Sequence, residues 1–199
     1  MPCWRSSAAI RSWKSGATWT ATGSRSAMPK MVILTGFMGS GKSSVGTLVA
    51  ERLGCRYIDL DAAIVEAAGC SINEIFARDG EAAFRELESA QLEQLLLVGE
   101  GGVLATGGGA VISPRNREVM RKCGLVINLK VTLDQVLARL HGCSDRPLLA
   151  GDDAAQRAAA LMKEREQFYA DADIRIDTDG KSVEDVANEI LCRLKGFSA

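Results

Sequence analysis

Short apolar runs alternate with longer amphipathic segments along most of the chain. The runs are rich in the hydrophobic and β-branched residues that strands favour, and they predict strands at residues 31–36, 56–61, 102–106, 125–130 and 174–177. In the segments between them apolar residues recur at helical spacing, as in 81–98 with Phe84, Leu87, Leu92, Leu95 and Leu96. Strands that alternate with helices predict an α/β fold with a five-stranded parallel sheet and helices on both faces.

Capping residues and glycines mark the ends of the predicted helices. Ser71 and Glu74 form a capping box, and Ser113 precedes Pro114 at a first helical position. The first two helices are predicted at 42–53 and 61–68. The later helices are predicted at 71–80, 81–98, 113–123, 132–141, 154–170 and 182–195. Where a helix has a capping residue, its range begins at that residue. The polar stretch 142–153 is predicted to be a loop.

Residues 1–30 differ in kind from the rest of the chain. They contain no acidic residue, many Ser, Thr, Ala and Arg residues, all three tryptophans, and no helix or strand periodicity. Such a composition is typical of an organelle transit peptide, which would direct the protein to a plastid. We favour the alternative that translation starts at Met28 or Met31. In both cases we expect a disordered leader, followed by a single domain at 31–196.

Overall charge and cysteine spacing narrow the classes of function. The 199 residues carry a formal net charge of −1, which provides no general attraction for nucleic acid or an anionic membrane. Six cysteines lie far apart without a C-x-x-C pair, and we expect reduced, mostly buried thiols in a cytoplasmic protein. No apolar run approaches the roughly 20 residues that span a bilayer. We expect small-molecule partners and a monomer.

The strongest motif is "GFMGSGKSS", residues 36–44, which matches G-x-x-x-x-G-K-[ST] directly after a predicted strand and before a predicted helix. In this motif backbone N–H groups and the helix N-terminus bind phosphate oxygens. Lys42 places a charge on the β- and γ-phosphates, and the Ser43 hydroxyl can ligate Mg²⁺. This setting favours a nucleotide site over an ordinary glycine-rich turn. The predicted nucleotide-binding residues are Gly39, Ser40, Gly41, Lys42, Ser43 and Ser44.

Two acidic residues, Asp59 and Asp61 in "DLD", end the second predicted strand. Ligands of open α/β sheets bind at this carboxyl edge. Side chains two positions apart on a strand point the same way, so both carboxylates could reach one site. One could bind Mg²⁺ through water and the other a substrate hydroxyl. The alternative is a solvated strand end at which Asp61 caps the next helix.

Further candidates lie at a glycine triplet and on two helices. Gly107, Gly108 and Gly109 follow the third predicted strand and would let backbone amides approach a ligand, although a flexible turn has the same composition. Arg85 and Arg165 lie within predicted helices. Either arginine could bind an anion or belong to a solvated helix face.

The loop "SDRPLLAG" places Arg146 before a proline, close to the single histidine, His141. Phosphoryl transfer needs a cation at the transferring group, and mobile loops often supply it. A plain surface arginine is the alternative. His141, near a predicted helix C-terminus, is better explained by a favourable interaction with the helix dipole.

In this order and spacing, the segments "GFMGSGKSSVG", "DLD", "FARDGEAAFRELE", "ATGGGAV", "RPLLAG" and "ALMKEREQFY" resemble the shikimate kinase family over about residues 31–195. The resemblance implies the nucleoside-monophosphate-kinase-like P-loop fold. It also implies a helical substrate-binding region at about 59–98 and a mobile lid at about 142–153. The implied reaction is transfer of a phosphoryl group from ATP, with Mg²⁺, to the 3-hydroxyl of shikimate in aromatic amino acid biosynthesis.

The resemblance also implies roles on the nucleotide side. Lys42 and Ser43 serve the phosphates and Mg²⁺, and Asp59 contacts the metal through water. Arg146 is the lid arginine that reaches ATP and, with Lys42 and Asp61, belongs to the catalytic set. Lys181 falls in the adenine-binding segment. Ser44 departs from the threonine that is common in the family, but its hydroxyl can still reach a phosphate.

On the acceptor side the implied contacts match the chemistry of shikimate, a small carboxylate with vicinal hydroxyls. Asp61 falls where the family binds the hydroxyls, and it is a possible proton acceptor. Arg85 and Arg165 fall where the family holds the carboxylate. Their guanidinium groups are forked cationic donors, which suit a carboxylate. The glycine triplet 107–109, Gly108 above all, contacts the substrate.

Three alternatives stay open at this point. A gluconate kinase shares the fold and the loop, but "DLD" combined with "GGGAV" argues for shikimate. A regulatory GTPase would need an N-K-x-D segment, which "NLKV" at 128–131 does not match. A nucleotide-binding module without turnover would not need the arginines and carboxylates of the acceptor side.

Overall fold

The computed structural model describes residues 30–98, 101–140 and 154–196. Most of the predicted leader at 1–30 and the predicted lid at 142–153, with Arg146, lie outside these residues, as does His141. The five predicted strands are confirmed, and they form one parallel sheet in the order β2-β3-β1-β4-β5. The strands are β1 (Met31–Thr35), β2 (Tyr57–Asp59), β3 (Gly102–Ala105), β4 (Leu125–Lys130) and β5 (Ile174–Asp177).

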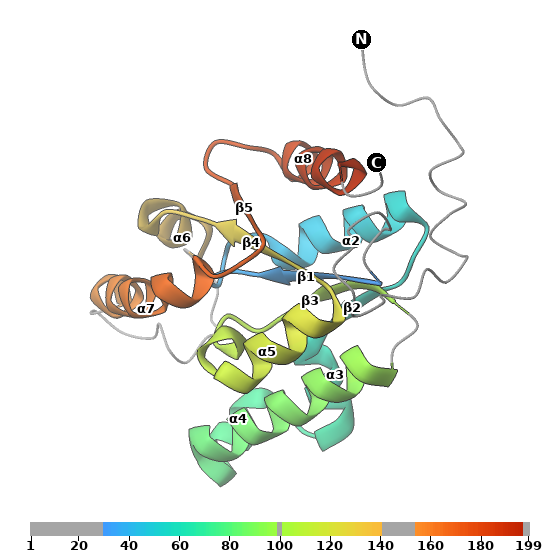
Figure 1. Cartoon of the computed structure of the whole chain (residues 1–199). Coiled ribbons are helices and arrows are strands. Elements are labelled where there is room, and N and C mark those ends of the chain that lie inside the picture. Colours follow the sequence, from blue (N-terminus) through green and yellow to red (C-terminus); the bar gives the residue numbers. More distant parts are fainter. Residues whose placement is uncertain (1–29, 99–100, 141–153, 197–199) are drawn as a thin grey trace.

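Helices cover both faces of the sheet, as predicted (Figure 1). They are α2 (Lys42–Leu53), α3 (Leu60–Ala68), α4 (Ile72–Val98), α5 (Pro114–Cys123), α6 (Leu133–Leu140), α7 (Ala154–Tyr169) and α8 (Val183–Lys195), with a short 3-10 helix at Ala110–Ile112. The predicted break between 71–80 and 81–98 is present inside α4, where Gly80 has a φ of 81° and a ψ of 175°. The capping box of Ser71 and Glu74 is also confirmed.

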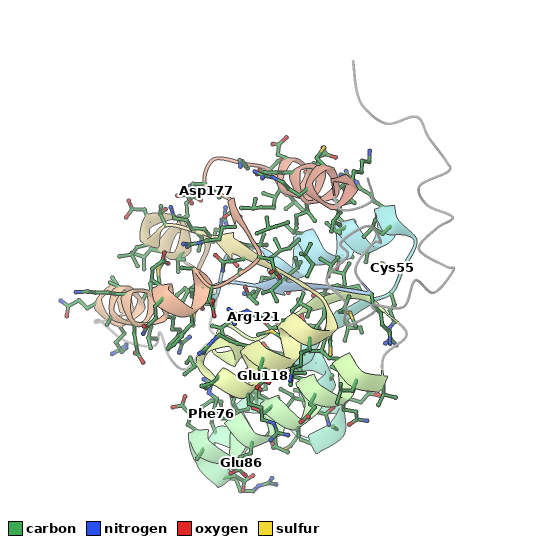
Figure 2. All side chains as sticks on the ribbon, in the orientation of Figure 1. Cys55, Phe76, Glu86, Glu118, Arg121 and Asp177 are labelled. Atoms are coloured by element: carbon green, nitrogen blue, oxygen red, sulfur yellow. The ribbon has the colours of Figure 1, made fainter. Side chains whose placement is uncertain are left out.

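The sheet separates two apolar layers, because successive side chains of a strand point to opposite faces. Val32 and Leu34 of β1 pack with α2 and α8, whereas Met31 and Ile33 pack with α3, α4, α5 and α7. Figure 2 shows side chains filling the space between the sheet and the helices on both faces. Among the described residues, no helix has the length and apolar character needed to cross a membrane.

The described cysteines differ in part from expectation. Cys55, Cys70 and Cys123 are half-buried, Cys192 is exposed, and all four are free thiols. The prediction of mostly buried thiols was therefore wrong for these residues, because three lie at the margins of the apolar layers rather than inside them.

Candidate active site

The phosphate loop connects β1 to α2 in a conformation that only glycine adopts readily. Gly36, Gly39 and Gly41 have φ values of 144°, 75° and 89°. A Cβ at Gly36 would lie 2.5 Å from the carbonyl oxygen of Leu129, so the loop also lies tightly against β4. The helix N-terminus at Lys42 follows directly. Backbone N–H groups and the helix dipole are therefore available to bind an anion.

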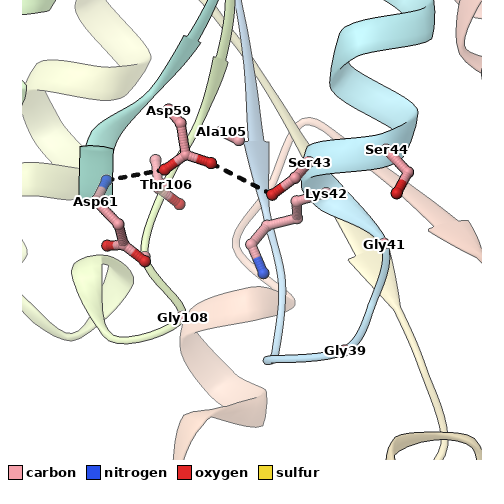
Figure 3. A pocket seen from close by; sticks show the side chains of 11 residues that line it. Gly39, Gly41, Lys42, Ser43, Ser44, Asp59, Asp61, Ala105, Thr106 and Gly108 are labelled. Carbon is pink, nitrogen blue, oxygen red and sulfur yellow. Dashed lines mark hydrogen bonds between the residues drawn. The ribbon is translucent and has the colours of Figure 1, made fainter. Parts of the chain in front are cut away.

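Lys42 lies within the curve of this loop (Figure 3). Its Nζ donates hydrogen bonds to the carbonyl oxygens of Gly36, at 2.8 Å, and Phe37, at 2.9 Å. Its charge is therefore held at the place where the loop would bind phosphate oxygens.

Asp59 links the loop to the acceptor side. Its Oδ1 caps α3 by accepting from the backbone N–H groups of Asp61, at 3.0 Å, and Ala62, at 3.3 Å. Its Oδ2 accepts from the Ser43 hydroxyl at 3.3 Å (Figure 3). The same oxygen accepts from the Tyr57 hydroxyl at 3.0 Å. Because both oxygens are held by donors, the carboxylate has one fixed orientation beside Ser43.

The placement of Asp61 corrects the sequence prediction in one respect. The second strand ends at Asp59, and Asp61 lies in the first turn of α3 instead of on the strand. Asp59 caps this helix, so Asp61 is not the cap that the alternative interpretation required. The two carboxylates nevertheless line the same cavity, because the chain turns from strand to helix between them.

That cavity has a volume of about 220 Å³. It lies at the carboxyl edge of the sheet, between the phosphate loop and the turn after β3 (Figure 3). Its lining combines nucleotide-side and acceptor-side predictions: Gly39, Gly41, Lys42, Ser43, Ser44, Asp59, Asp61, Ala105, Thr106, Gly107 and Gly108. Parallel strands bring these residues together although they are far apart in the sequence.

The glycine triplet packs against charged side chains of α3 and α4. A Cβ at Gly107 would lie 2.9 Å from Asp61 Oδ1 and 2.8 Å from Glu88 Oε1. A Cβ at Gly109 would overlap the guanidinium of Arg85. Side chains at Gly107 or Gly109 would therefore have to displace these charged groups.

Glu88 is a site residue that the sequence analysis missed. It is 1% exposed, its Oε2 accepts from Arg85 Nη1 at 2.8 Å, and its Oε1 has no hydrogen-bond partner in the described residues. Burial raises the pKa of Glu88, while the charges of Arg85 and Arg165 act against that rise. The sequence did contain a sign that Glu88 is buried. It recurs at a spacing of four with the apolar residues Phe84, Leu92 and Leu96, so it lies on the same buried face of the helix.

Arg165 of α7 is also buried, at 5% exposed, and its Nε has no hydrogen-bond partner among the described residues. Its charge acts on Glu88, so Arg165 and Arg85 approach the same carboxylate from two different helices. A buried guanidinium with an unsatisfied N–H group favours an anionic ligand. The alternative interpretation, in which Arg165 belongs to a solvated helix face, is therefore excluded.

The structure does not bring every predicted residue to the cavity. Lys181 pairs with Glu189 of α8 at 2.8 Å and is not among the residues that line it. Arg139, which the sequence analysis did not select, donates from Nη1 to the Gly39 carbonyl oxygen at 2.9 Å. The only sequence signal for Arg139 was a basic residue in the last turn of the helix before the predicted lid.

A glycine-rich phosphate loop at the carboxyl edge of a five-stranded parallel sheet, next to a pocket for a polar acceptor, defines the class of P-loop kinases. Comparison with known proteins narrows this class. The family model described as shikimate kinase matches residues 38–195. The chain therefore belongs to the shikimate kinase family.

Individual relatives agree with this assignment. A shikimate kinase of Geobacter metallireducens is 58% identical over 89% of this chain and 98% of its own. One from Geobacter sulfurreducens is 60% identical over 80% of this chain and 87% of its own. Among solved structures, the shikimate kinase from Acinetobacter baumannii in complex with shikimate is similar with a TM-score of 0.81 and 34% identity, covering 86% of this chain and 95% of that one.

Proposed function

We propose that this chain transfers the γ-phosphoryl group of ATP to the 3-hydroxyl group of shikimate, giving shikimate 3-phosphate and ADP in aromatic amino acid biosynthesis. The observation that carries the proposal is the convergence of Asp61, Glu88 and Arg85 on the glycine triplet beside the phosphate loop. A hydroxylated carboxylate needs cationic donors at one end and a carboxylate acceptor at the other. The phosphate loop would bind the phosphates of ATP, the donor substrate.

In this proposal each side chain has a separate task. Asp61 accepts a hydrogen bond from the attacking hydroxyl and can take its proton, while Arg85 and Arg165 hold the substrate carboxylate. Lys42 stabilises the charge on the transferring phosphate. Arg146 would add a second cation from the lid, and Lys181 would lie near the adenine. Positioning and charge supply most of the acceleration, because the protein forms no covalent bond in such a transfer.

The test is ADP release by the purified chain with ATP and Mg²⁺ in the presence of shikimate. We expect turnover that depends on shikimate and none with gluconate, the acceptor of the nearest alternative enzyme. Turnover with gluconate alone would assign the chain to the other activity. Nucleotide binding without turnover on either acceptor would identify a binding module. The monomeric state and the cytoplasmic location stay predictions. Sedimentation of the purified protein tests the monomeric state.

The donor set also fits Mg²⁺. Magnesium prefers oxygen ligands and keeps several of its waters, and the Ser43 hydroxyl and Asp59 Oδ2 are oxygens that lie 3.3 Å apart at the cavity wall. We propose that Ser43 ligates the ion directly and that Asp59 contacts it through water. When bound, the ion neutralises charge on the β- and γ-phosphates.

Ser43→Ala tests this assignment. Removal of the hydroxyl ligand should reduce the factor by which Mg²⁺ strengthens ATP binding, about tenfold, while binding of metal-free ATP stays the same. Calorimetric titration of ATP with and without Mg²⁺ measures both affinities without any turnover. Ser44→Ala is the neighbouring control, since Ser44 is not assigned to the metal. An unchanged Mg²⁺ effect in Ser43→Ala would remove Ser43 from the metal site.

The arginines give a second test of the acceptor site. Arg85→Ala and Arg165→Ala each remove a charge-assisted partner worth roughly 1.5–3 kcal/mol, which corresponds to an increase in the shikimate KM of about 10- to 150-fold. The ATP KM should change little. Steady-state kinetics with each substrate varied in turn measures both constants.

The two variants should differ in stability. Arg85→Ala leaves Glu88 buried without its ion-pair partner, so it should lower the melting temperature as well. Arg78→Ala on the same helix is the control, because Arg78 is exposed and pairs with Asp79. Equal losses for ATP and shikimate would mean that the arginines serve the fold or the nucleotide instead.

A further inference from the structure

Tyr169, the last residue of α7, has no role in the function proposed above. Its side chain is 5% exposed, and its hydroxyl donates a hydrogen bond of 2.6 Å to the carbonyl oxygen of Gly108. Burial raises the pKa of Tyr169 to about 12, so the hydroxyl keeps its proton at neutral pH. The bond therefore ties the end of α7 to the middle of the glycine triplet.

The carbonyl that Tyr169 binds belongs to the peptide between Gly108 and Gly109. All peptide bonds of the described residues are trans, so the N–H of Gly109 points away from the Tyr169 hydroxyl. Two consecutive glycines restrict the rotation of this peptide very little. The hydrogen bond of Tyr169 is thus a contact from outside the turn that selects one orientation of the peptide.

This peptide lies at a point where small rotations matter. Gly108 lines the cavity, and a Cβ on it would lie 3.5 Å from both the Gly36 carbonyl oxygen and the Met38 nitrogen of the phosphate loop. On its other side, Gly109 packs against the guanidinium of Arg85. The peptide therefore lies between the phosphate loop and Arg85, where its orientation affects groups on both sides.

Tyr169 is also placed to act together with Arg165. Residues four apart on a helix lie on the same face, so Arg165 and Tyr169 project from α7 one turn apart. Arg165 is one proposed ligand of the substrate carboxylate, and Gly108 is one proposed substrate contact. The Tyr169 hydroxyl therefore interacts with both sides: it donates to the Gly108 carbonyl oxygen and lies in the field of the Arg165 charge.

We propose that Tyr169 is a positioning residue for the acceptor substrate, whose hydroxyl holds the Gly108–Gly109 peptide at a fixed orientation relative to Arg165. The inference rests on the proposed function for its substrate, but it concerns a residue that this function does not use. It predicts that loss of the hydroxyl weakens binding of shikimate and leaves the nucleotide site intact.

Tyr169→Phe removes the hydroxyl and keeps the ring. We expect the shikimate KM to rise about three- to tenfold, as for the loss of one buried hydrogen bond, with the ATP KM unchanged. The effect should be coupled to that of Arg165, so that Tyr169→Phe raises the KM less in an Arg165→Ala background than in the native chain. A hydroxyl that served stability alone would lower the melting temperature and leave the shikimate KM unchanged in both backgrounds.

Phe168→Leu is the matched control. Phe168 is half-buried in the same helical turn and stacks under the Arg117 guanidinium at 4.7 Å, but its side chain has no hydroxyl. The Phe168→Leu variant should have a lower melting temperature, but its shikimate KM should not change selectively. The proposal is overturned if Tyr169→Phe has a native shikimate KM, raises both KM values equally, or fails to fold. Because the native chain is assayed in parallel, its failure to use shikimate would instead overturn the proposed function.

Discussion

Asp61→Asn is expected to lower the turnover of shikimate by about 10²- to 10⁴-fold, the range typical of losing a general base. An ionised carboxylate can take the proton of the attacking hydroxyl, whereas an amide of the same shape cannot. Asp61 lines the cavity opposite the phosphate loop, with its Oδ1 at the glycine triplet. Nucleotide binding should stay unchanged. Coupled ADP detection measures turnover, and calorimetry measures ATP binding.

A smaller effect would have a different meaning. If Asp61 only orients the hydroxyl, the amide oxygen of Asn can still accept the hydrogen bond, and turnover should fall less than about tenfold, with an increase in the shikimate KM. Glu66→Gln is the control for loss of a carboxylate on the same helix, because Glu66 is an exposed residue of α3. Loss of ATP binding in Asp61→Asn would contradict the separation between donor and acceptor sides.

The features that could be predicted from the sequence depend on local pattern. The strands, the capping box at Ser71 and the phosphate loop each follow from residues that are close together in the chain. The sheet edge then brings "DLD" and the glycine triplet to the loop, because ligands of parallel sheets bind at the carboxyl ends of the strands. Asp61 lines the cavity, as the sequence predicted, but it lies on a different element from the one predicted, since a two-residue difference in strand length is not visible in an apolar run.

The features that were missed depend on contacts between distant residues. Tyr169 lies 61 positions from its partner Gly108, and nothing near it in the sequence indicates that bond. Glu88 lies on a helix that carries many charged residues, where a solvated carboxylate is the usual outcome. It is buried because it lies on the inward-facing apolar stripe of α4, with its Oε1 at the glycine turn. The sequence therefore predicts which groups line the cavity better than it predicts which groups hold them in place.

Lys42→Met is expected to lower kcat by about 10²- to 10³-fold, a size typical of removing one electrostatic group that stabilises transition-state charge. Met has a similar length but no charge, so the volume of the loop is preserved. ATP should still bind, more weakly, because the backbone N–H groups of the loop and the N-terminus of α2 remain. The shikimate KM should be nearly native, since Lys42 Nζ donates hydrogen bonds to the carbonyl oxygens of Gly36 and Phe37 and to the Ser40 hydroxyl, which all belong to the phosphate loop.

The same variant removes the donor that Gly36 and Phe37 share, so a loss of stability has to be separated from a loss of catalysis. Thermal denaturation with and without ATP does this: ATP should still raise the melting temperature of Lys42→Met, because a ligand that binds only the folded state stabilises it. Lys195→Met at the exposed end of α8 is the control for charge alone. A native kcat in Lys42→Met would mean that the backbone of the loop stabilises the transferring phosphate without its lysine.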